Sequence, residues 1–328
     1  MLICYLGIVY LITLWYPVEE RSLRIAIVLA SATASGAFGG CVAYGVGFLN
    51  GSGGLEGFRW LFIIEGIITV LSVALVIFFL PDWPARARWL SDDDKKYIDD
   101  RIAVMGGGYT KRHGTKKEVL ATAGPGRMWI HYLAYLLNCI PLGSLTFFTP
   151  TIVTGLGYDS IKAQLMTVPP WVVGYFFSLF LGWSADKHNA RGLHVMCSSI
   201  LGAIGWVTAG SLPADAYAQR YGMLFFCACG AFPSSGPLSA WVTCNVPAFA
   251  TMAIATACNN SMAGLSQIIA QWIWRPEEAE IGYPTGNYVC AACSFATAAV
   301  ALGLRIWYAR MNRVKAIDAS GNERIWLL

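Results

Sequence analysis

The sequence predicts an all-α membrane protein, and three observations support this fold class. Of the 328 residues, 56% are apolar and 13% are charged, whereas a soluble domain contains about 45–50% apolar and about 25% charged residues. The mean hydropathy is +0.53. Charge-free runs long enough to cross a bilayer recur along the chain. Because so few charges cannot cover a water-exposed surface of this size, we exclude a soluble enzyme, a disordered protein and a nucleic-acid-binding protein.

The expected membrane spans are charge-free runs of roughly 20 or more residues, the length that crosses a hydrocarbon core of about 30 Å. One run, 60–81, is interrupted only by Glu65, and another, 221–274, has room for two helices that turn at Pro247. A ninth apolar run, 2–16, is too short to span and lacks the basic start and cleavage site of a signal peptide, so we interpret it as half of a further span. The eight full spans are expected in 25–55, 60–81, 128–158, 163–185, 192–214, 221–274 and 281–304.

The basic residues predict the orientation of these spans, because cytoplasmic loops are enriched in Lys and Arg. Nineteen of the 23 basic residues fall in one alternating set of connections, 21–24, 81–127, 184–193 and 305–328. The remaining four, Arg59, Lys162, Arg220 and Arg275, fall in the other set. The linker and the C-terminus are therefore expected in the cytoplasm. The connections near 50–58, 154–162, 212–220 and 275–284 are expected outside.

One long polar segment, residues 82–127, divides three spans from six. Ser91 and Asp94 predict a helix N-cap with a carboxylate at the third helical position, followed by a short helix over 95–103. We interpret the segment as a solvated cytoplasmic linker, and a specific lipid or regulatory site is the alternative. Three glycines at 106–108 precede a basic run formed by Lys111, Arg112, Lys116 and Lys117.

The spans lack the converging ionisable groups that an intramembrane enzyme needs. They contain one carboxylate, Glu65, and no Lys or Arg, and no paired Asp, His-Glu-x-x-His or Ser/His motif lies at membrane depth. The pairs Cys227/Cys229 and Cys290/Cys293 have no His or carboxylate neighbours, so we interpret them as small core residues. We therefore expect no enzymatic activity, no metal and no cofactor.

Glu65 needs its own explanation, because a carboxylate is costly at membrane depth. One hypothesis is a structural pairing with a helix end or with Arg59, six residues earlier in the sequence. The other hypothesis is proton coupling. The residues alone leave both open.

Polar residues and prolines in the spans predict surfaces that face protein or water. Amides recur on one helical face of the 221–274 run, where contact with lipid would be costly. This stripe either forms helix–helix hydrogen bonds or lines a substrate path. Asn138 and the segment 232–237, with its two prolines, also place polar groups or broken backbone at membrane depth, and Gly36-x-x-x-Gly40 predicts a close helix contact. The stripe consists of Asn260, Gly264, Gln267 and Gln271.

The segment 141–171 carries a distinctive series of motifs. It contains Pro141-Leu142, Ser144-Leu145-Thr146-Phe147-Phe148, Pro150-Thr151-Ile152, Gly155-Leu156-Gly157-Tyr158 and Ala163-Gln164-Leu165-Met166-Thr167-Val168-Pro169-Pro170-Trp171. This series resembles the seventh and eighth helices of the fungal anion:cation symporter branch of the major facilitator superfamily. That branch includes permeases for allantoate, nicotinate and pantothenate.

Three other segments agree with this resemblance. Residues 10–24 resemble the end of helix four, and 57–66, with Arg59 and Glu65, resemble the start of helix six. Residues 182–192 resemble the loop between helices eight and nine. The resemblance implies that Arg59 and Glu65 are architectural, and that the charged residues of 182–192 tie helix ends together and gate the cavity. Those residues are Asp186, Lys187 and Arg191.

The resemblance also implies four parts in an N-terminally truncated, facilitator-type bundle. The remnant of the N-terminal bundle, with part of helix four and helices five and six, is expected in 1–81. The cytoplasmic linker is 82–127, the C-terminal six-helix bundle is 128–308, and a cytoplasmic tail is 309–328. About eight full spans and one partial span would make up this incomplete fold.

The function implied by the resemblance is proton-coupled uptake of a small organic anion, such as a vitamin carboxylate or a ureide, across the plasma membrane. Because the spans contain no Lys or Arg, the charge that would balance the anion is expected on helices that precede this chain. The alternative is a truncated membrane protein that does not transport and is inert or serves as an interaction partner. The oligomeric state is left open. The substrate-cavity candidates are Asn138, Ser234, Ser235, Trp241, Asn260 and Gln267.

Overall fold

The structure is a computed structural model. It describes residues 7–8, 11–12, 15–16, 21–79, 87, 89–104, 126–156, 160–246 and 252–317. Within these ranges the regular structure is helical, with no strand. The helices are α2 (Arg21–Gly47), η2 (Ser52–Gly54), α3 (Gly57–Phe79), α4 (Asp92–Val104), α6 (Gly126–Gly155), α7 (Ser160–Met166), α8 (Val168–Lys187), α9 (Arg191–Ser211), α10 (Tyr217–Cys244), α11 (Met252–Trp272), η5 (Pro276–Ile281) and α12 (Pro284–Ile317).

Seven helices of the described part are long and apolar enough to cross a membrane. They are α2, α3, α6, the α7–α8 pair, α9, α10 and α12, which agree with seven of the eight expected spans. The eighth, α11, is 21 residues long but carries several amides, and it is not among the seven. The 221–274 run does form two helices, α10 and α11, while Pro247 lies outside the described residues.

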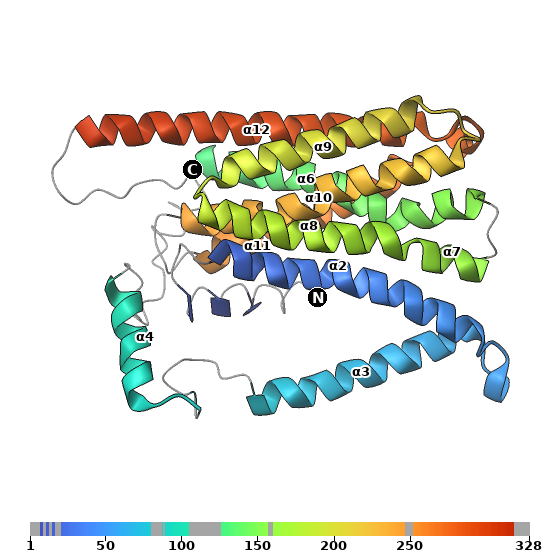
Figure 1. The fold of residues 1–328 in the computed structure, drawn as a ribbon, viewed down its shortest axis with the longest axis horizontal. Coiled ribbons are helices and arrows are strands. Elements are labelled where there is room, and N and C mark those ends of the chain that lie inside the picture. Colours follow the sequence, from blue (N-terminus) through green and yellow to red (C-terminus); the bar gives the residue numbers. More distant parts are fainter. Residues whose placement is uncertain are drawn as a thin grey trace.

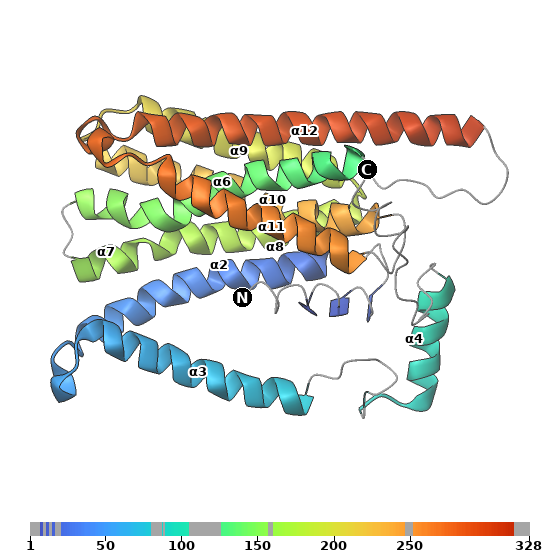
Figure 2. The ribbon, with the colours of Figure 1, turned by 180° about the vertical axis from the view of Figure 1, so that it is seen from behind.

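Most of the long helices lie side by side along one axis (Figures 1 and 2). Helix α10 is central, because it packs against α2, α6, α8 and α9, and α12 packs against α6 and α9. Helix α2 packs on α8, while α3 turns away at the α2–α3 connection and has no buried residue. We call the end where α8 stops and α9 starts the linker end, because α4 lies there, and the opposite end the distal end.

Small residues allow the closest helix contacts, as the sequence predicts for Gly36 and Gly40. A Cβ built on Gly36 would meet the ring of Trp171, and one on Gly40 would lie 2.9 Å from the carbonyl oxygen of Gln164. In the same way, Gly202 of α9 and Gly230 of α10 bring their backbones into contact. The predicted Gly36-x-x-x-Gly40 contact between α2 and the α7–α8 pair is therefore confirmed.

The linker contains the predicted capped helix. Ser91 Oγ accepts a hydrogen bond from the backbone N–H of Asp94 at 3.2 Å and donates one to Asp94 Oδ2 at 2.6 Å. The first bond caps α4 and the second joins the two side chains. Helix α4 starts three residues before the expected 95–103. The glycines at 106–108 and the basic run that follows lie outside the described residues.

Two helices differ from the sequence expectation, one in where it ends and the other in its continuity. Helix α12 continues to Ile317, nine residues into the expected tail 309–328, because a helix does not have to end where its apolar run ends. Helix α10 passes through Pro233 and Pro237 without a break. Each proline only removes the donor to the carbonyl four residues earlier.

Candidate functional site

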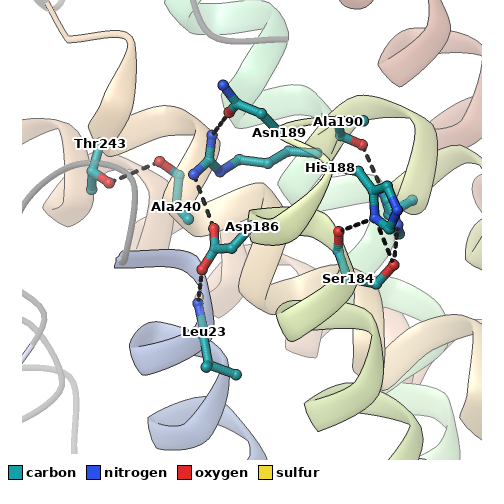
Figure 3. Close-up of polar contacts among 10 residues, drawn as sticks. Leu23, Ser184, Asp186, His188, Asn189, Ala190, Ala240 and Thr243 are labelled. Carbon is teal, nitrogen blue, oxygen red and sulfur yellow. Dashed lines mark hydrogen bonds and ion pairs between the residues drawn. The ribbon is translucent and has the colours of Figure 1, made fainter.

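A charged network joins three helices at the linker end (Figure 3). Asp186, at the end of α8, accepts a hydrogen bond from the guanidinium of Arg191, with 3.0 Å between Nη2 and Oδ1. Its second oxygen, Oδ2, accepts the backbone N–H of Leu23 in the first turn of α2 at 2.6 Å. The guanidinium also donates to Asn189 Oδ1 at 3.1 Å. One carboxylate therefore links α2 to the α8–α9 turn.

This turn is held in shape by a second group of hydrogen bonds, also drawn in Figure 3. His194 Nε2 lies 2.8 Å from Ser184 Oγ, and its Nδ1 lies 2.8 Å from the carbonyl oxygen of Ala190. His188 Nδ1 lies 2.9 Å from the carbonyl oxygen of Ser184. Asn189, between the two helices, adopts a positive φ of 48°, which Asn tolerates better than most residues.

The third predicted gate residue, Lys187, points elsewhere. Its ammonium lies 4.8 Å from the centre of the Trp183 ring, on the exposed side of α8. The structure thus brings Asp186 and Arg191 together, with the Arg191 side chain fully buried and that of Asp186 14% exposed.

Two of the predicted cavity residues meet in the centre of the bundle. Asn138 of α6 donates through Nδ2 to Ser235 Oγ and to the carbonyl oxygen of Ala231, each at 3.3 Å. Both side chains are buried. This contact connects α6 to the proline-containing part of α10, and each of the two helices contributes a polar side chain to it.

Helix α11 adds two buried amides that are not fully hydrogen bonded. Asn260 Nδ2 has no hydrogen-bond partner, and neither has Asn259 Oδ1. Asn259 Nδ2 lies 3.5 Å from Ser239 Oγ of α10. Gln267 is half buried, and its Oε1 would lie 2.7 Å from a Cβ on Gly143 of α6. Buried polar atoms normally have partners, so these two atoms of Asn259 and Asn260 are exceptions.

The other two cavity candidates lie within packed interfaces. Ser234 faces α9, where its Oγ lies 2.7 Å from Ser198 Oγ, and it donates to the carbonyl oxygen of Gly230 at 2.9 Å. Trp241 is fully buried, with the rings of His131 and Tyr308 at centroid distances of 5.0 and 6.0 Å.

Arg59 and Glu65 lie on α3. The Arg59 guanidinium is 5.8 Å from the centre of the Phe58 ring, and Glu65 is exposed. In the described part of the chain the two residues form no ion pair with each other; the pairs found there are Arg191–Asp186 and Lys95–Asp92. Of the hypotheses for Glu65, the pairing with Arg59 is therefore not present in this structure, and pairing with a helix end and proton coupling stay open.

Sequence reasoning missed Arg220. The charge pattern places it in a connection outside the spans, but it belongs to the first turn of α10 and is only 5% exposed. Its guanidinium donates through Nη2 to the carbonyl oxygens of Ala209, at 3.2 Å, and of Gly282. A lone basic residue at the edge of an apolar run gives no sign of burial, because the residues that cover it come from distant loops.

Outside the spans, Glu278 of η5 is hydrogen bonded to the start of α12. Its carboxylate accepts hydrogen bonds from the side-chain hydroxyl and the backbone N–H of Thr285. These hydrogen bonds hold the pKa of Glu278 below its ordinary value, the hydroxyl contributing most.

In the described ranges, no group of three or more His, Cys, Asp or Glu side chains gathers into a metal-binding arrangement.

Known proteins resemble this chain over most of its length. It is 43% identical over 322 residues to the MFS transporter prlL of Fungal sp. (strain NRRL 50135), covering 98% of this chain and 65% of the relative. It is 31% identical over 257 residues to the MFS-type transporter cnsO of Penicillium expansum, covering 74% of this chain and 49% of the relative. The chain thus spans between about half and two thirds of the length of these curated relatives.

A solved structure shares the fold. The MFS proton:xylose symporter XylE, bound to 6-bromo-6-deoxy-D-glucose, matches with a TM-score of 0.65 at 14% identity, covering 92% of this chain and 66% of that chain. The family model of the Major Facilitator Superfamily matches residues 3–271. The helical bundle, its apolar spans and this family match agree, and the chain belongs to the Major Facilitator Superfamily.

Proposed function

We propose that this chain takes part in proton-coupled uptake of a small organic anion by alternating access, as a member of the anion:cation symporter branch. Membership of a transporter superfamily supports solute transport, and XylE, which shares the fold, is a proton symporter. The motifs in 141–171 and 182–192 support the anion branch. The proposed location is the plasma membrane, with the linker end in the cytoplasm.

The observation that carries this proposal is the polar seam between α6, α10 and α11. Asn138 and Ser235 meet there, and the buried amides of Asn259 and Asn260 keep atoms without partners. An unpartnered polar atom is costly inside an apolar bundle. A substrate that supplies the missing partner would remove this cost, which is how a few placed polar groups fix a ligand in an apolar site.

We assign the six cavity candidates to two roles on this basis. Asn138, Ser235, Asn260 and Gln267 are proposed to face the substrate. Ser234 is satisfied by α9 and Trp241 is enclosed by aromatic rings, so we assign both to packing. The pair Asp186–Arg191, with its bond to Leu23, is proposed to close the linker end, because it links α2 to the α8–α9 turn.

Uptake of labelled nicotinate, pantothenate and allantoate tests the proposal in fungal cells that lack their own permeases. We expect uptake above the empty vector for at least one of the three, and less uptake when a protonophore is added. Asn260→Ala should lower uptake by up to about ten-fold, the effect of one lost hydrogen bond. The matched control is Ser261→Ala, an exposed neighbour on α11, which should leave uptake unchanged.

Uptake no better than the empty vector, with the protein at the cell surface, would contradict transport by this chain and favour the non-transporting alternative. Uptake that a protonophore does not lower would contradict proton coupling alone. Equal uptake by Asn260→Ala and Ser261→Ala would remove α11 from the substrate path.

A further inference from the structure

Arg220 is a buried cation that forms no ion pair with any residue in the described part of the chain. It is 5% exposed, and its Nη2 donates to two backbone carbonyls, of Ala209 and Gly282. Its Nε has no hydrogen-bond partner. The ion pairs of the described part are Lys95–Asp92 and Arg191–Asp186, and neither involves Arg220. Burying a charge without a paired charge costs free energy, so this guanidinium is suited to receive an anion.

A cavity of about 310 Å³ lies beside this arginine at the distal end of the bundle. Its volume is at the lower limit of the usual range for small-molecule sites. Hydroxyl groups reach it from α6 and from α10, and aromatic rings form part of its wall. Besides Arg220, its lining includes Thr151, Thr154, Tyr217, Phe148 and Tyr283.

The walls of the cavity are held by contacts outside it. The Phe148 ring stacks on Trp274 with 3.6 Å between the centroids, and Tyr283 meets Phe148 edge-on at 4.5 Å. Gly282 adopts a φ of 81°, and a Cβ there would collide with the guanidinium of Arg220. The backbone of the η5–α12 connection therefore closes directly over the arginine.

The acidic residues nearby do not neutralise the arginine. Glu278 uses its carboxylate to bind Thr285. Asp215, Glu277 and Glu280 are exposed. None of them forms an ion pair with Arg220 in the described part of the chain, which leaves its charge available to a ligand.

We propose that this distal cavity binds a small carboxylate with a ring-sized apolar body. Both protons of Nη2 go to the two carbonyls, so the guanidinium meets a carboxylate in a charge-assisted contact through its other nitrogens. The hydroxyls of Thr151 and Tyr217 can donate further hydrogen bonds, and Phe148 with Tyr283 receives the apolar body. The site lies at the distal end, away from the Asn138–Ser235 pair. A role for this cavity as an external binding site for the transported anion rests on the proposed function. The binding of a carboxylate to the cavity does not rest on it.

Calorimetry on the purified full chain in detergent tests the binding without any transport. The probe is benzoate, and benzamide is its uncharged isostere. We expect benzoate to bind at least about ten-fold more tightly, as for a charge-assisted pair. Equal affinities for the two, or no benzoate binding, would overturn the proposal whatever the uptake measurements show.

Variants separate ligand binding from a purely structural role of Arg220. Arg220→Gln, which keeps donors for the two carbonyls, should lose the preference for benzoate. Arg220→Lys should retain part of the preference, because it keeps the charge but not the planar guanidinium. Arg275→Gln, an exposed arginine at the same end, is the matched control and should bind benzoate normally. An unchanged preference in folded Arg220→Gln would overturn the proposal. If that variant does not fold, the benzoate and benzamide comparison on the unchanged protein decides.

Discussion

Asp186 shows how one side chain can determine a contact between distant segments. Its two oxygens bind different partners, the buried guanidinium of Arg191 and the backbone N–H of Leu23. The second bond satisfies a donor in the first turn of α2, where a carboxylate also complements the helix dipole. Removing the charge would break the ion pair that Asp186 forms with the fully buried Arg191. The side chain is therefore important to both the fold and the proposed gate.

Asp186→Asn should lower the free energy of unfolding by roughly 1.5–3 kcal/mol, the value of hydrogen bonds to charged groups. The thermal unfolding of the purified protein measures this loss. Hydrogen exchange should also become faster in the first turn of α2, because Leu23 loses a charged acceptor. Asp100→Asn makes the same chemical change at an exposed position of α4 and should stay within about 0.5 kcal/mol of the unchanged protein. Equal stability of the two variants would argue against the network.

For contacts between single residues, the sequence predicts those between residues close in the chain and misses those between distant residues that the fold brings together. Asp186 and Arg191 are five residues apart and flank one turn, so their joint role could be anticipated. Arg220 and Gly282 are 62 residues apart. The burial of Arg220 depends on how the η5–α12 connection closes over it, which the pattern of apolar residues does not encode.

At the scale of elements, α9 and α10 touch through two glycines. A Cβ on Gly230 would collide with the Cα of Gly202, and a Cβ on Gly202 would lie 2.9 Å from the Cα of Gly230. Each added Cβ would meet backbone atoms of the facing helix, which cannot move away as the end of a flexible side chain can. Such small-residue contacts are a main source of helix association in membranes.

Gly230→Ala should therefore destabilise the bundle by about 1–3 kcal/mol, the usual cost of overpacking. Thermal unfolding in detergent measures the change. Gly222→Ala on the same helix is the control, since a Cβ there meets nothing within 4 Å, and the better helix propensity of Ala should make it neutral or stabilising by up to about 1 kcal/mol. A Gly230→Ala protein as stable as Gly222→Ala would contradict the close packing of α9 on α10.

Helix ends show why elements are only partly predictable. The start of α4 could be predicted because Ser91 and Asp94 carry the cap in their own side chains. The end of α12 could not, since hydropathy marks where the membrane stops and not where hydrogen bonding stops. The charged turns up to Ile317 continue the helix beyond the charge-free run, which ends at Leu304.

At the scale of the whole molecule, the charges divide between the two ends of the bundle. Lys187, Arg191 and the basic residues of α4 lie at the linker end, and Arg220 and Arg275 lie at the distal end. Nineteen of all 23 basic residues fall in the connections of the linker side. Because basic loops stay in the cytoplasm, this asymmetry supports an orientation with the linker end inside and the distal cavity outside.

Cysteine labelling of intact cells with a membrane-impermeant maleimide tests this orientation. Ser52→Cys, in the exposed η2 turn of the distal end, should label in intact cells. Lys96→Cys, exposed on α4, should label only after the cells are permeabilised. The unchanged protein, with its ten native cysteines, provides the background signal. Labelling of Lys96→Cys in intact cells would show the opposite orientation. The distal cavity proposed to bind a carboxylate would then face the cytoplasm and could not receive an anion from outside.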